Sequence, residues 1–331
     1  MQEIRLGTIG SGFIVHNILN GVQVTDRISC EAVYSRSEEK GRELAQEYGV
    51  RKVYTDLDEM LRDETVNCVY IASPNNLHYE QTKKVLLAGK HVICEKPFCT
   101  QAKQARELAA LAKEKGLFLV DATPTSYLPN FEILKRELPK IGRVRLVQSS
   151  YCQYSSRYDQ VLEGKLPNVF NRAFAGGCLM DINYYNVYLN VALFGKPDQV
   201  TYYPNIRDGL ADTSGVAVMQ YGDFVCECTG AKDTWGVNSV QIQGEKGYIY
   251  VTDGSNGIAS LNVVTKEKEE AFDEQQGADH WMLEVREITR LMLAADYEAM
   301  YRRLDTVADV IETIEEARYK AGILFPGEEV K

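Results

Sequence analysis

Three side chains that can exchange a proton stand in two short motifs of this sequence. Glu95-Lys-Pro97 ends an apolar run, and Gly176-Gly-Cys-Leu-Met-Asp181-Ile-Asn-Tyr-Tyr185 carries an aspartate four residues before a tyrosine. An ammonium, a carboxylate and a phenol can each hold or release a proton beside a substrate oxygen. Residues four apart on a helix share a face, so we predict that Asp181 and Tyr185 act together. The alternatives are an ordinary strand-end ion pair and a half-buried helix whose aromatic residues pack.

The N-terminal residues predict a site for a dinucleotide. Residues 4–10 read as a buried strand, and the helix that follows opens with the residues Gly10, Ser11, Gly12, Phe13 and Ile14. The first glycine permits a tight turn. The second allows the backbone to approach a pyrophosphate, whose charge meets the N–H groups at the helix N-terminus. Val15 stands where a third glycine or an alanine is usual.

The end of the second strand bears on which dinucleotide binds. It lacks the Asp or Glu that usually binds the ribose 2′-hydroxyl of NAD. Ser35, Arg36 and Lys40 offer a hydroxyl and two cations instead, which suit a 2′-phosphate. The alternative is a solvated helix start with Ser37 as its N-cap. We expect NADP(H) to be preferred, NAD(H) to be accepted as well, and no metal to be needed.

A second group of candidate cofactor residues follows the fourth strand. Ligands of open α/β sheets bind at the carboxyl ends of the strands. His78 falls in the first turn of the next helix, where it either faces the nucleotide or has a structural part. With the strand-end motif, the group comprises Ser73, Pro74, Asn75, Asn76, His78, Glu95, Lys96 and Pro97.

Composition narrows the class of protein. The chain has 331 residues, 45% of them hydrophobic, so two globular domains are expected. Its net charge is −10. Lys and Arg are scattered, which argues against nucleic acid or a membrane surface as a partner. The sequence shows neither a leader pattern nor a long apolar span, and its eight cysteines read as free thiols. We therefore expect a cytoplasmic protein.

The order of elements predicts an α/β fold in two parts. Short strands apolar on both faces alternate with helices over residues 1–122, which is typical of a doubly wound parallel sheet. Residues 123–331 read as an α+β domain with a large, mostly antiparallel sheet. Strands are predicted at 4–10, 29–34, 67–73, 91–96, 118–122, 144–154 and repeatedly over 199–265. Helices are predicted near 13–21, 37–48, 56–64, 77–88, 100–115 (with Thr100 as N-cap), 128–138, 177–194, 278–295 and 304–321.

These motifs resemble the Gfo/Idh/MocA oxidoreductase family over essentially the whole chain. The two glycines at 10 and 12, Ser73-Pro-Asn75, the strand-end motif and the Gly176–Tyr185 motif occur in the family's order and spacing. The resemblance implies a Rossmann domain followed by an α+β domain whose open sheet forms a homodimer or homotetramer interface. Tyr185, where many members have histidine, is similar to the dihydrodiol/xylose dehydrogenase and glucose–fructose oxidoreductase branches. Asn183 stands where glycine is common, which would alter the shape of the pocket.

The resemblance implies that Lys96, Asp181 and Tyr185 line the substrate site. The expected reaction is reversible hydride transfer between nicotinamide C4 and a secondary alcohol or ketone of a sugar, polyol or cyclic diol. A tyrosine has an ordinary pKa of about 10, which a cationic Lys96 would lower toward that of a useful base. In the alternative assignment Lys96 is the direct acid/base and Tyr185 positions the substrate. Further candidate substrate contacts are Tyr127, Tyr154, Asn171 and Arg172.

Two other function classes share this architecture. One is a non-catalytic NADP(H) sensor, against which the retention of Lys96, Asp181 and Tyr185 argues. The other is a glycosidase that oxidises its substrate transiently with a tightly held NAD, against which the pair Ser35 and Arg36 argues.

Overall fold

The computed structural model describes residues 1–207 and 209–329, and the chain forms two compact units. The first unit is Met1–Thr123 with Asp279–Ala308, and the second is Pro124–Ala278 with the chain from Asp309 onward. The predicted boundary after residue 122 falls where the chain first passes between units. Residues 279–308, which we expected in the second domain, belong instead to the first. The apolar face of a helix does not reveal which surface it will cover.

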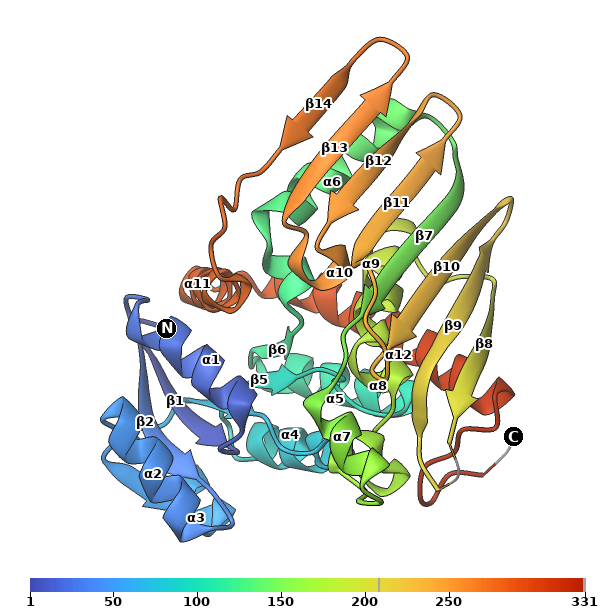
Figure 1. The fold of residues 1–331 in the computed structure, drawn as a ribbon. Helices are drawn as coiled ribbons and strands as arrows, with labels where there is room; N and C mark the ends of the chain where they lie inside the picture. Colours follow the sequence, from blue (N-terminus) through green and yellow to red (C-terminus); the bar gives the residue numbers. More distant parts are fainter. Residues whose placement is uncertain (208, 330–331) are drawn as a thin grey trace. The chain divides into compact units, whose positions relative to one another are not determined.

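The sheet of the first unit is parallel throughout, with the order β3-β2-β1-β4-β5-β6 (Figure 1). This confirms the predicted doubly wound sheet. Its strands are β1 (Ile4–Ile9), β2 (Ile28–Tyr34), β3 (Lys52–Tyr54), β4 (Cys68–Ile71), β5 (His91–Glu95) and β6 (Leu119–Ala122). The sequence did not predict β3, because three half-buried residues are too few to show a period.

The helices of the first unit follow the prediction closely. They are α1 (Phe13–Gln23), α2 (Glu38–Tyr48), α3 (Leu57–Arg62), α4 (His78–Leu87), α5 (Ala102–Lys115) and α11 (His280–Leu293). The prediction of Thr100 as N-cap of α5 is wrong, because Gln101 holds that position and the Thr100 hydroxyl donates to Gln104 instead. Gly116 ends α5 in the left-handed conformation (φ 62°), as its sequence position predicts.

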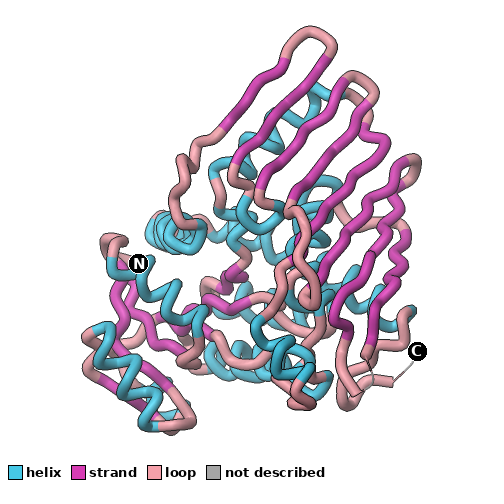
Figure 2. The backbone as a smooth tube through the Cα atoms, viewed as in Figure 1, coloured by secondary structure: helices cyan, strands magenta, loops and turns pink. Residues whose placement is uncertain are grey.

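The second unit is built on an eight-stranded sheet with the order β14-β13-β12-β11-β7-β10-β9-β8 (Figures 1 and 2). Every described pairing is antiparallel except that of β7 with β10, which confirms the predicted open, mostly antiparallel sheet. Its strands are β7 (Val144–Cys152), β8 (Gln199–Ile206), β9 (Asp212–Tyr221), β10 (Phe224–Ala231), β11 (Ser239–Gly244), β12 (Gly247–Thr252), β13 (Ser260–Thr265) and β14 (Glu269–Phe272).

The helices of this unit depart from the prediction in several places. They are α6 (Pro129–Glu137), α7 (Ser156–Leu162), α8 (Cys178–Asp181), α9 (Asn183–Phe194), α10 (Gly254–Gly257) and α12 (Tyr297–Lys320), which begins in the first unit. We expected irregular chain where α7 lies. We also expected one helix over 177–194, which is broken at Ile182. Residues 182–191 are all buried, so their sequence has no polar face whose interruption would mark the break.

Three asparagines attach α9 to the covered face of the sheet. The Nδ2 of Asn183 donates to Cys228 O (2.9 Å), that of Asn186 to Thr229 O (2.9 Å), and that of Asn190 to the Ser149 hydroxyl (3.1 Å). All three asparagines are fully buried. The side chain of Asn183 is therefore hydrogen-bonded to β10, and its effect on the shape of the pocket stays a prediction.

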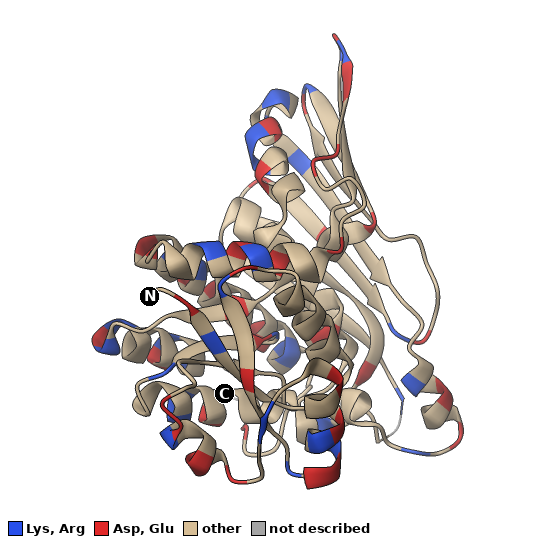
Figure 3. Cartoon of the chain, turned by 90° about the vertical axis from the view of Figure 1, so that its left-hand side faces the viewer, with Lys and Arg blue, Asp and Glu red and all other residues tan. Residues whose placement is uncertain are grey.

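Charge and cysteine placement agree with the sequence. Basic and acidic side chains are interspersed along the chain (Figure 3). All eight cysteines are free thiols, and Cys226 and Cys228 lie on the buried face of β10 as their alternation predicts. Among the described helices, none has the length and apolar character that crossing a bilayer requires.

Candidate active site

The turn between β1 and α1 has the geometry of a phosphate cradle. Gly10 has φ 116°, and a Cβ there would lie 2.7 Å from Ala72 O, so this position requires glycine. A Cβ on Gly12 would meet no atom within 4 Å, which leaves open space beside the backbone. The N-terminus of α1 has neither a side-chain cap nor an acid in its first turn. Its N–H groups and dipole therefore suit a pyrophosphate.

The remaining residues of this turn divide between solvent and core. Ser11 and Ile14 are half-buried, whereas Phe13 is exposed and its ring meets Trp281 of α11 edge-on at 6.1 Å. Val15, at the third glycine position of the motif, is fully buried. A β-branched residue is therefore accommodated there in the core.

The end of β2 presents one buried hydroxyl and two exposed cations. The Ser35 hydroxyl accepts from Ser37 N–H (3.3 Å), and Ser37 caps α2 by accepting from Lys40 N–H (3.4 Å). The side chains of Arg36 and Lys40 are exposed, and over residues 1–207 and 209–329 neither makes a hydrogen bond or ion pair. Ser37 is thus an N-cap, as one interpretation held, while the two cations remain available to an anion.

His78 joins the two loops that we predict to contact the cofactor. Its Nδ1 lies 2.8 Å from Pro97 O and its Nε2 lies 2.8 Å from Ser73 O. Burial lowers the pKa of His78 below its ordinary value. Because both ring nitrogens meet backbone carbonyls, the structure favours the structural interpretation of this histidine.

The loop of residues 73–76 follows β4, as predicted. The Ser73 hydroxyl donates to Gln81 Oε1 (2.6 Å), and Pro74 leads into a 3₁₀ turn over Asn75–Leu77. Asn75 is half-buried and Asn76 is exposed.

The Glu95 carboxylate organises the strand end that carries Lys96. Glu95 is buried, its Oε1 accepts from the Tyr70 hydroxyl (2.7 Å), and its Oε2 accepts from the Lys96 N–H (3.2 Å). The Lys96–Pro97 peptide is cis, and the Lys96 side chain is half-buried. Glu95 therefore fixes the backbone of the lysine that we predict to be catalytic.

Two further acids near Glu95 escaped the sequence analysis. Burial raises the pKa of Asp121 to about 6, and burial with the charges of Glu95 and Asp121 raises that of Glu284 well above its ordinary value. Both side chains are fully buried. The available signal was an acid inside an apolar strand or helix pattern, as in Val120-Asp121-Ala122.

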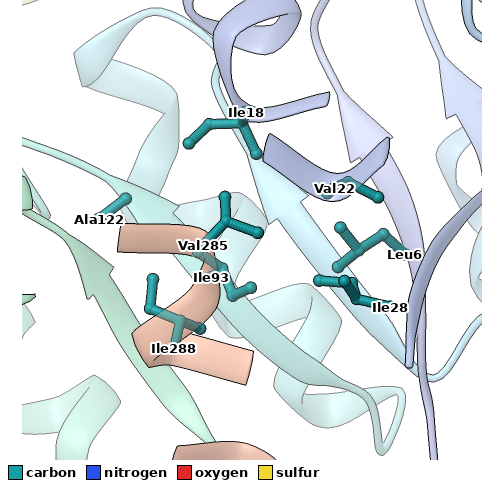
Figure 4. A pocket seen from close by; sticks show the side chains of 8 residues that line it. All are labelled: Leu6, Ile18, Val22, Ile28, Ile93, Ala122, Val285 and Ile288. Atoms are coloured by element: carbon teal, nitrogen blue, oxygen red, sulfur yellow. The ribbon is translucent and has the colours of Figure 1, made fainter. Parts of the chain in front are cut away.

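An apolar cavity of the first unit lies among β1, β2, β5, β6, α1 and α11 (Figure 4). Its volume is about 10 Å³, which leaves room for one water molecule at most. The cavity is a packing gap and not a substrate site, because its lining has no polar side chain. The lining residues are Leu6, Ile18, Val22, Ile28, Ile93, Ala122, Val285 and Ile288.

In the second unit, the two glycines before α8 are required by close packing. A Cβ on Gly176 would lie 2.6 Å from two carbonyl oxygens, and Gly177 has φ 132°. A Cβ on Gly177 would also collide with Asp212 Oδ1. The same carboxylate accepts from the Leu179 N–H (2.7 Å) and the Tyr202 hydroxyl (2.7 Å). Asp212 thus holds the start of the helix that ends at Asp181.

Asp181 is the one residue between 175 and 191 that is not buried, with 27% of its side chain exposed. Its Oδ2 accepts a charged hydrogen bond from Lys232, whose side chain is 7% exposed. The sequence analysis missed Lys232, because the two residues are 51 positions apart. A lysine directly after the buried strand β10 was the only signal.

Tyr185 lies one turn beyond Asp181, but in the separate helix α9. Its ring packs with Tyr151, whose centroid is 5.8 Å away, in a cluster with Cys178 and Ile182. The Tyr151 hydroxyl accepts from Asn256 Nδ2 (3.1 Å). The predicted four-residue spacing is kept, although the helix is not continuous between the two side chains.

The other candidate substrate residues have different surroundings. Tyr154 stacks on Trp235 with ring centroids 4.1 Å apart, and Trp235 is 78% exposed. Arg172 Nε donates to Leu210 O (3.0 Å), while the Asn171 side chain accepts from Ala173 N–H. Tyr127 is buried. The stacked pair of Tyr154 and Trp235 therefore presents an aromatic face to solvent, whereas Asn171 supports its own turn and Arg172 ties that turn to residue 210.

Comparison with known proteins decides the family. Residues 4–122 match the oxidoreductase family with an NAD-binding Rossmann fold, and residues 138–250 match the GFO/IDH/MocA C-terminal domain. The chain is 33% identical to the Escherichia coli protein described as the uncharacterized oxidoreductase YgjR, over 99% of each chain. The chain belongs to the Gfo/Idh/MocA family. It is an NAD(P)-binding oxidoreductase, as the motifs predicted.

Other members of the Gfo/Idh/MocA family are similar over nearly the whole length. The NADP(+) scyllo-inositol 2-dehydrogenase IolU of Bacillus subtilis is 34% identical, over 98% of this chain and 99% of its own. The human trans-1,2-dihydrobenzene-1,2-diol dehydrogenase is 26% identical at the same coverage. The 3-ketoreductase KijD10 of Actinomadura kijaniata shares the fold, with a TM-score of 0.83 at 20% identity and coverage of 96% and 97%.

Proposed function

We propose that this protein is an NADP-preferring dehydrogenase of a sugar, polyol or cyclic diol, with Lys96, Asp181 and Tyr185 as its catalytic residues. The observation that carries the proposal is the placement of Asp181. It is a charged carboxylate at the one accessible point of a buried segment, one turn from Tyr185. A carboxylate in such a place suits a ligand rich in hydroxyl groups.

The chain's own residues divide the chemistry as follows. NADP(H), when bound, supplies or accepts the hydride. The hydroxyl proton must leave as the substrate is oxidised, and Tyr185 and Lys96 are the two groups that can take it. Lys96 also stabilises negative charge on the substrate oxygen, and Asp181 orients a neighbouring hydroxyl.

The preference for NADP(H) is supported by the end of β2. The exposed cations of Arg36 and Lys40 stand where an NAD site has an acid. The cofactor in the name of the B. subtilis relative is also NADP(+). The gap beside Gly12 and the uncapped N-terminus of α1 suit the pyrophosphate of either dinucleotide.

A ring-shaped substrate is supported by the stacked pair Tyr154 and Trp235. An exposed indole face offers apolar area to the C–H face of a sugar or cyclitol, and the Tyr154 hydroxyl is already directed at Asp159 (2.7 Å). The inositol and dihydrodiol substrates in the names of two relatives are rings of this kind.

The test is a substrate screen followed by two substitutions. Inositols, aldoses, cyclic diols and dicarbonyls are assayed with NADP⁺, NADPH, NAD⁺ and NADH by absorbance of the reduced nicotinamide. Lys96→Met and Tyr185→Phe should each lower kcat by about 10²- to 10⁴-fold while NADP(H) binding is kept. Lys103→Met and Tyr301→Phe, both in the first unit, are matched controls and should keep the wild-type rate.

Three outcomes would contradict the proposal. Nucleotide binding without hydride exchange on any member of the panel would favour a sensor. Near-wild-type rates in both the Lys96 and the Tyr185 variants would remove these residues from the mechanism. A tightly held cofactor that is not consumed while a glycoside is cleaved would favour the glycosidase.

We also propose that the protein self-associates as a homodimer or homotetramer through the outer face of its eight-stranded sheet. That face exposes Tyr203, Val225 and Tyr248, opposite the face that α9 covers. A cytoplasmic location is part of the same proposal, supported by the eight free thiols.

A further inference from the structure

The Lys232 ammonium is buried beside the carboxylate predicted to bind substrate. We propose that Lys232 is a positioning residue for substrate recognition, which holds Asp181 ionised and directed at a substrate hydroxyl. This inference rests on the proposed function. Lys232 is only 6% exposed, and a buried lysine is rare unless its charge is paired. Its Nζ donates to Asp181 Oδ2, and this is its one ion pair among the described residues.

The backbone of Lys232 is held on both sides. Its N–H donates to Thr213 O (2.9 Å), and its C=O accepts from Ser155 N–H (2.9 Å). Asp181 is likewise held, because its N–H donates to Gly177 O (3.1 Å). Both partners of the pair therefore start from fixed backbone positions, which limits the entropy lost in holding the two charges together.

Two other acids lie in the same region as Asp181 and add negative charge around it. Cys178 experiences the charges of Asp181, Asp212, Asp233 and Lys232 together, so three acids share this region with one lysine. Asp212 accepts from Leu179 N–H and the Tyr202 hydroxyl, and Asp233 accepts from the hydroxyls of Thr213 (2.7 Å) and Ser214 (3.1 Å).

The donors of those two acids are neutral, whereas the donor to Asp181 is a cation. Repulsion among the three acids would favour a protonated Asp181, and the lysine opposes that effect. An ionised carboxylate has about four acceptor positions, so it can accept from Lys232 and from a substrate hydroxyl at the same time. Asp181 then acts as a fixed acceptor and not as a proton carrier. The Lys232 side chain is directed at Asp181, so it acts through that residue.

The experiment measures kcat and KM from pH 5.5 to 9.5, with the substrate found in the screen, for Lys232→Met, Lys232→Arg, Asp181→Asn and the Asp181→Asn/Lys232→Met double variant. Lys232→Met should raise the KM for substrate about 10- to 100-fold and move the acidic limb of the kcat/KM profile to higher pH. The KM for NADP⁺ should stay within about twofold. Lys232→Arg should restore most of the loss, since it keeps the charge.

The double variant separates positioning from a general structural effect. It leaves no unpaired charge, so it serves even where Lys232→Met alone fails to fold. In the Asp181→Asn background, Lys232→Met should cause no further loss. Lys90→Met removes an equally buried lysine of the first unit, whose Nζ donates to Asp63 O and Val66 O, and should leave the KM for substrate unchanged.

The inference is overturned by wild-type kinetics and pH profile in Lys232→Met, or by a further tenfold loss when Lys232→Met is added to Asp181→Asn. A wild-type protein that transfers no hydride contradicts the proposed function instead. The two failures are thereby distinguished.

Discussion

At the scale of single residues, we predict that the exposed Arg36 guanidinium sets the choice of cofactor. It follows the buried Ser35 at the end of β2, where an acid would repel a 2′-phosphate and a cation attracts it. No rearrangement of the described backbone is needed for that contact, because the side chain is already in solvent. The effect of its removal should therefore be confined to the cofactor that carries the phosphate.

Arg36→Ala should raise the KM for NADP⁺ about 10- to 100-fold, the range expected for loss of a charged hydrogen bond. The KM for NAD⁺ should change little. Steady-state kinetics with both cofactors measures the difference. Arg51→Ala, at the other end of the neighbouring strand β3, is the matched control. An unaltered KM for NADP⁺ in Arg36→Ala would remove the argument for NADP(H) preference.

Asp121 makes stability depend on pH at the scale of one residue. Burial raises its pKa from 3.8 to about 6, against the opposing effects of the Thr123 hydroxyl and the Arg303 charge. Between these values the folded state binds more protons than the unfolded state. The free energy of unfolding should therefore fall as pH rises from about 4 to 6 and then level off. Asp121 should account for about 3 kcal/mol of this fall.

Asp121→Asn should abolish this part of the pH dependence, because the amide does not ionise. Unfolding by urea at pH 4.5, 5.5 and 7 measures it. The free energy of unfolding of the variant minus that of wild type should be more positive at pH 7 than at pH 4.5. Asp26→Asn, an exposed acid, should leave the slope unchanged. Equal slopes in wild type and Asp121→Asn would show that the carboxyl does not retain its proton in the folded state.

At the scale of elements, the end of α12 is held by a buried ion pair. The Arg318 guanidinium donates to Glu328 Oε2 (2.9 Å) and Oε1 (3.0 Å), and also to Ile323 O (3.0 Å). Its carbon lies 4.0 Å from the centroid of the Phe325 ring. Both charged side chains are almost fully buried. The pair therefore fixes the segment after α12 against its own helix.

Glu328→Ala should destabilise the second unit by about 3–5 kcal/mol, because the guanidinium stays buried without its carboxylate. Scanning calorimetry should show a lower transition temperature for that unit. Glu329→Ala removes an exposed neighbouring acid and should have no effect. If both variants had the transition temperature of wild type, the ion pair would contribute nothing to holding the segment after α12 against its helix.

At the scale of the whole molecule, the two faces of the eight-stranded sheet differ in how far they are buried. One face packs beneath α9, with Val147, Cys226 and Cys228 fully buried. On the other face Val225 and Tyr248 are accessible. Exposed apolar residues that gather on one face are a common site of protein association.

Val225→Lys and Tyr248→Lys should convert the proposed oligomer into a monomer, since each places a charge in an apolar contact. Sedimentation velocity at micromolar concentration measures the mass of each variant. Leu87→Lys changes an exposed apolar residue of the first unit and should leave the assembly intact. A monomeric wild type, or an unchanged mass in both sheet variants, would contradict association through this face.

Local features of this chain were determined by the sequence itself. The glycine turn at 10–12, the alternation of buried strands with helices, and the stop at Gly116 follow from steric limits and periodicity within a few residues. The same short range explains the errors at Thr100 and β3, where neighbouring residues offered two acceptable boundaries or too little pattern.

Only the tertiary structure decided how distant segments combine. It placed 279–308 with the first unit, broke the helix at Ile182, and brought Lys232 to Asp181. None of these follows from spacing, because an apolar helix face or a strand-end lysine has many acceptable partners. The choice among them depends on packing and charge summed over the folded chain, which no local pattern encodes.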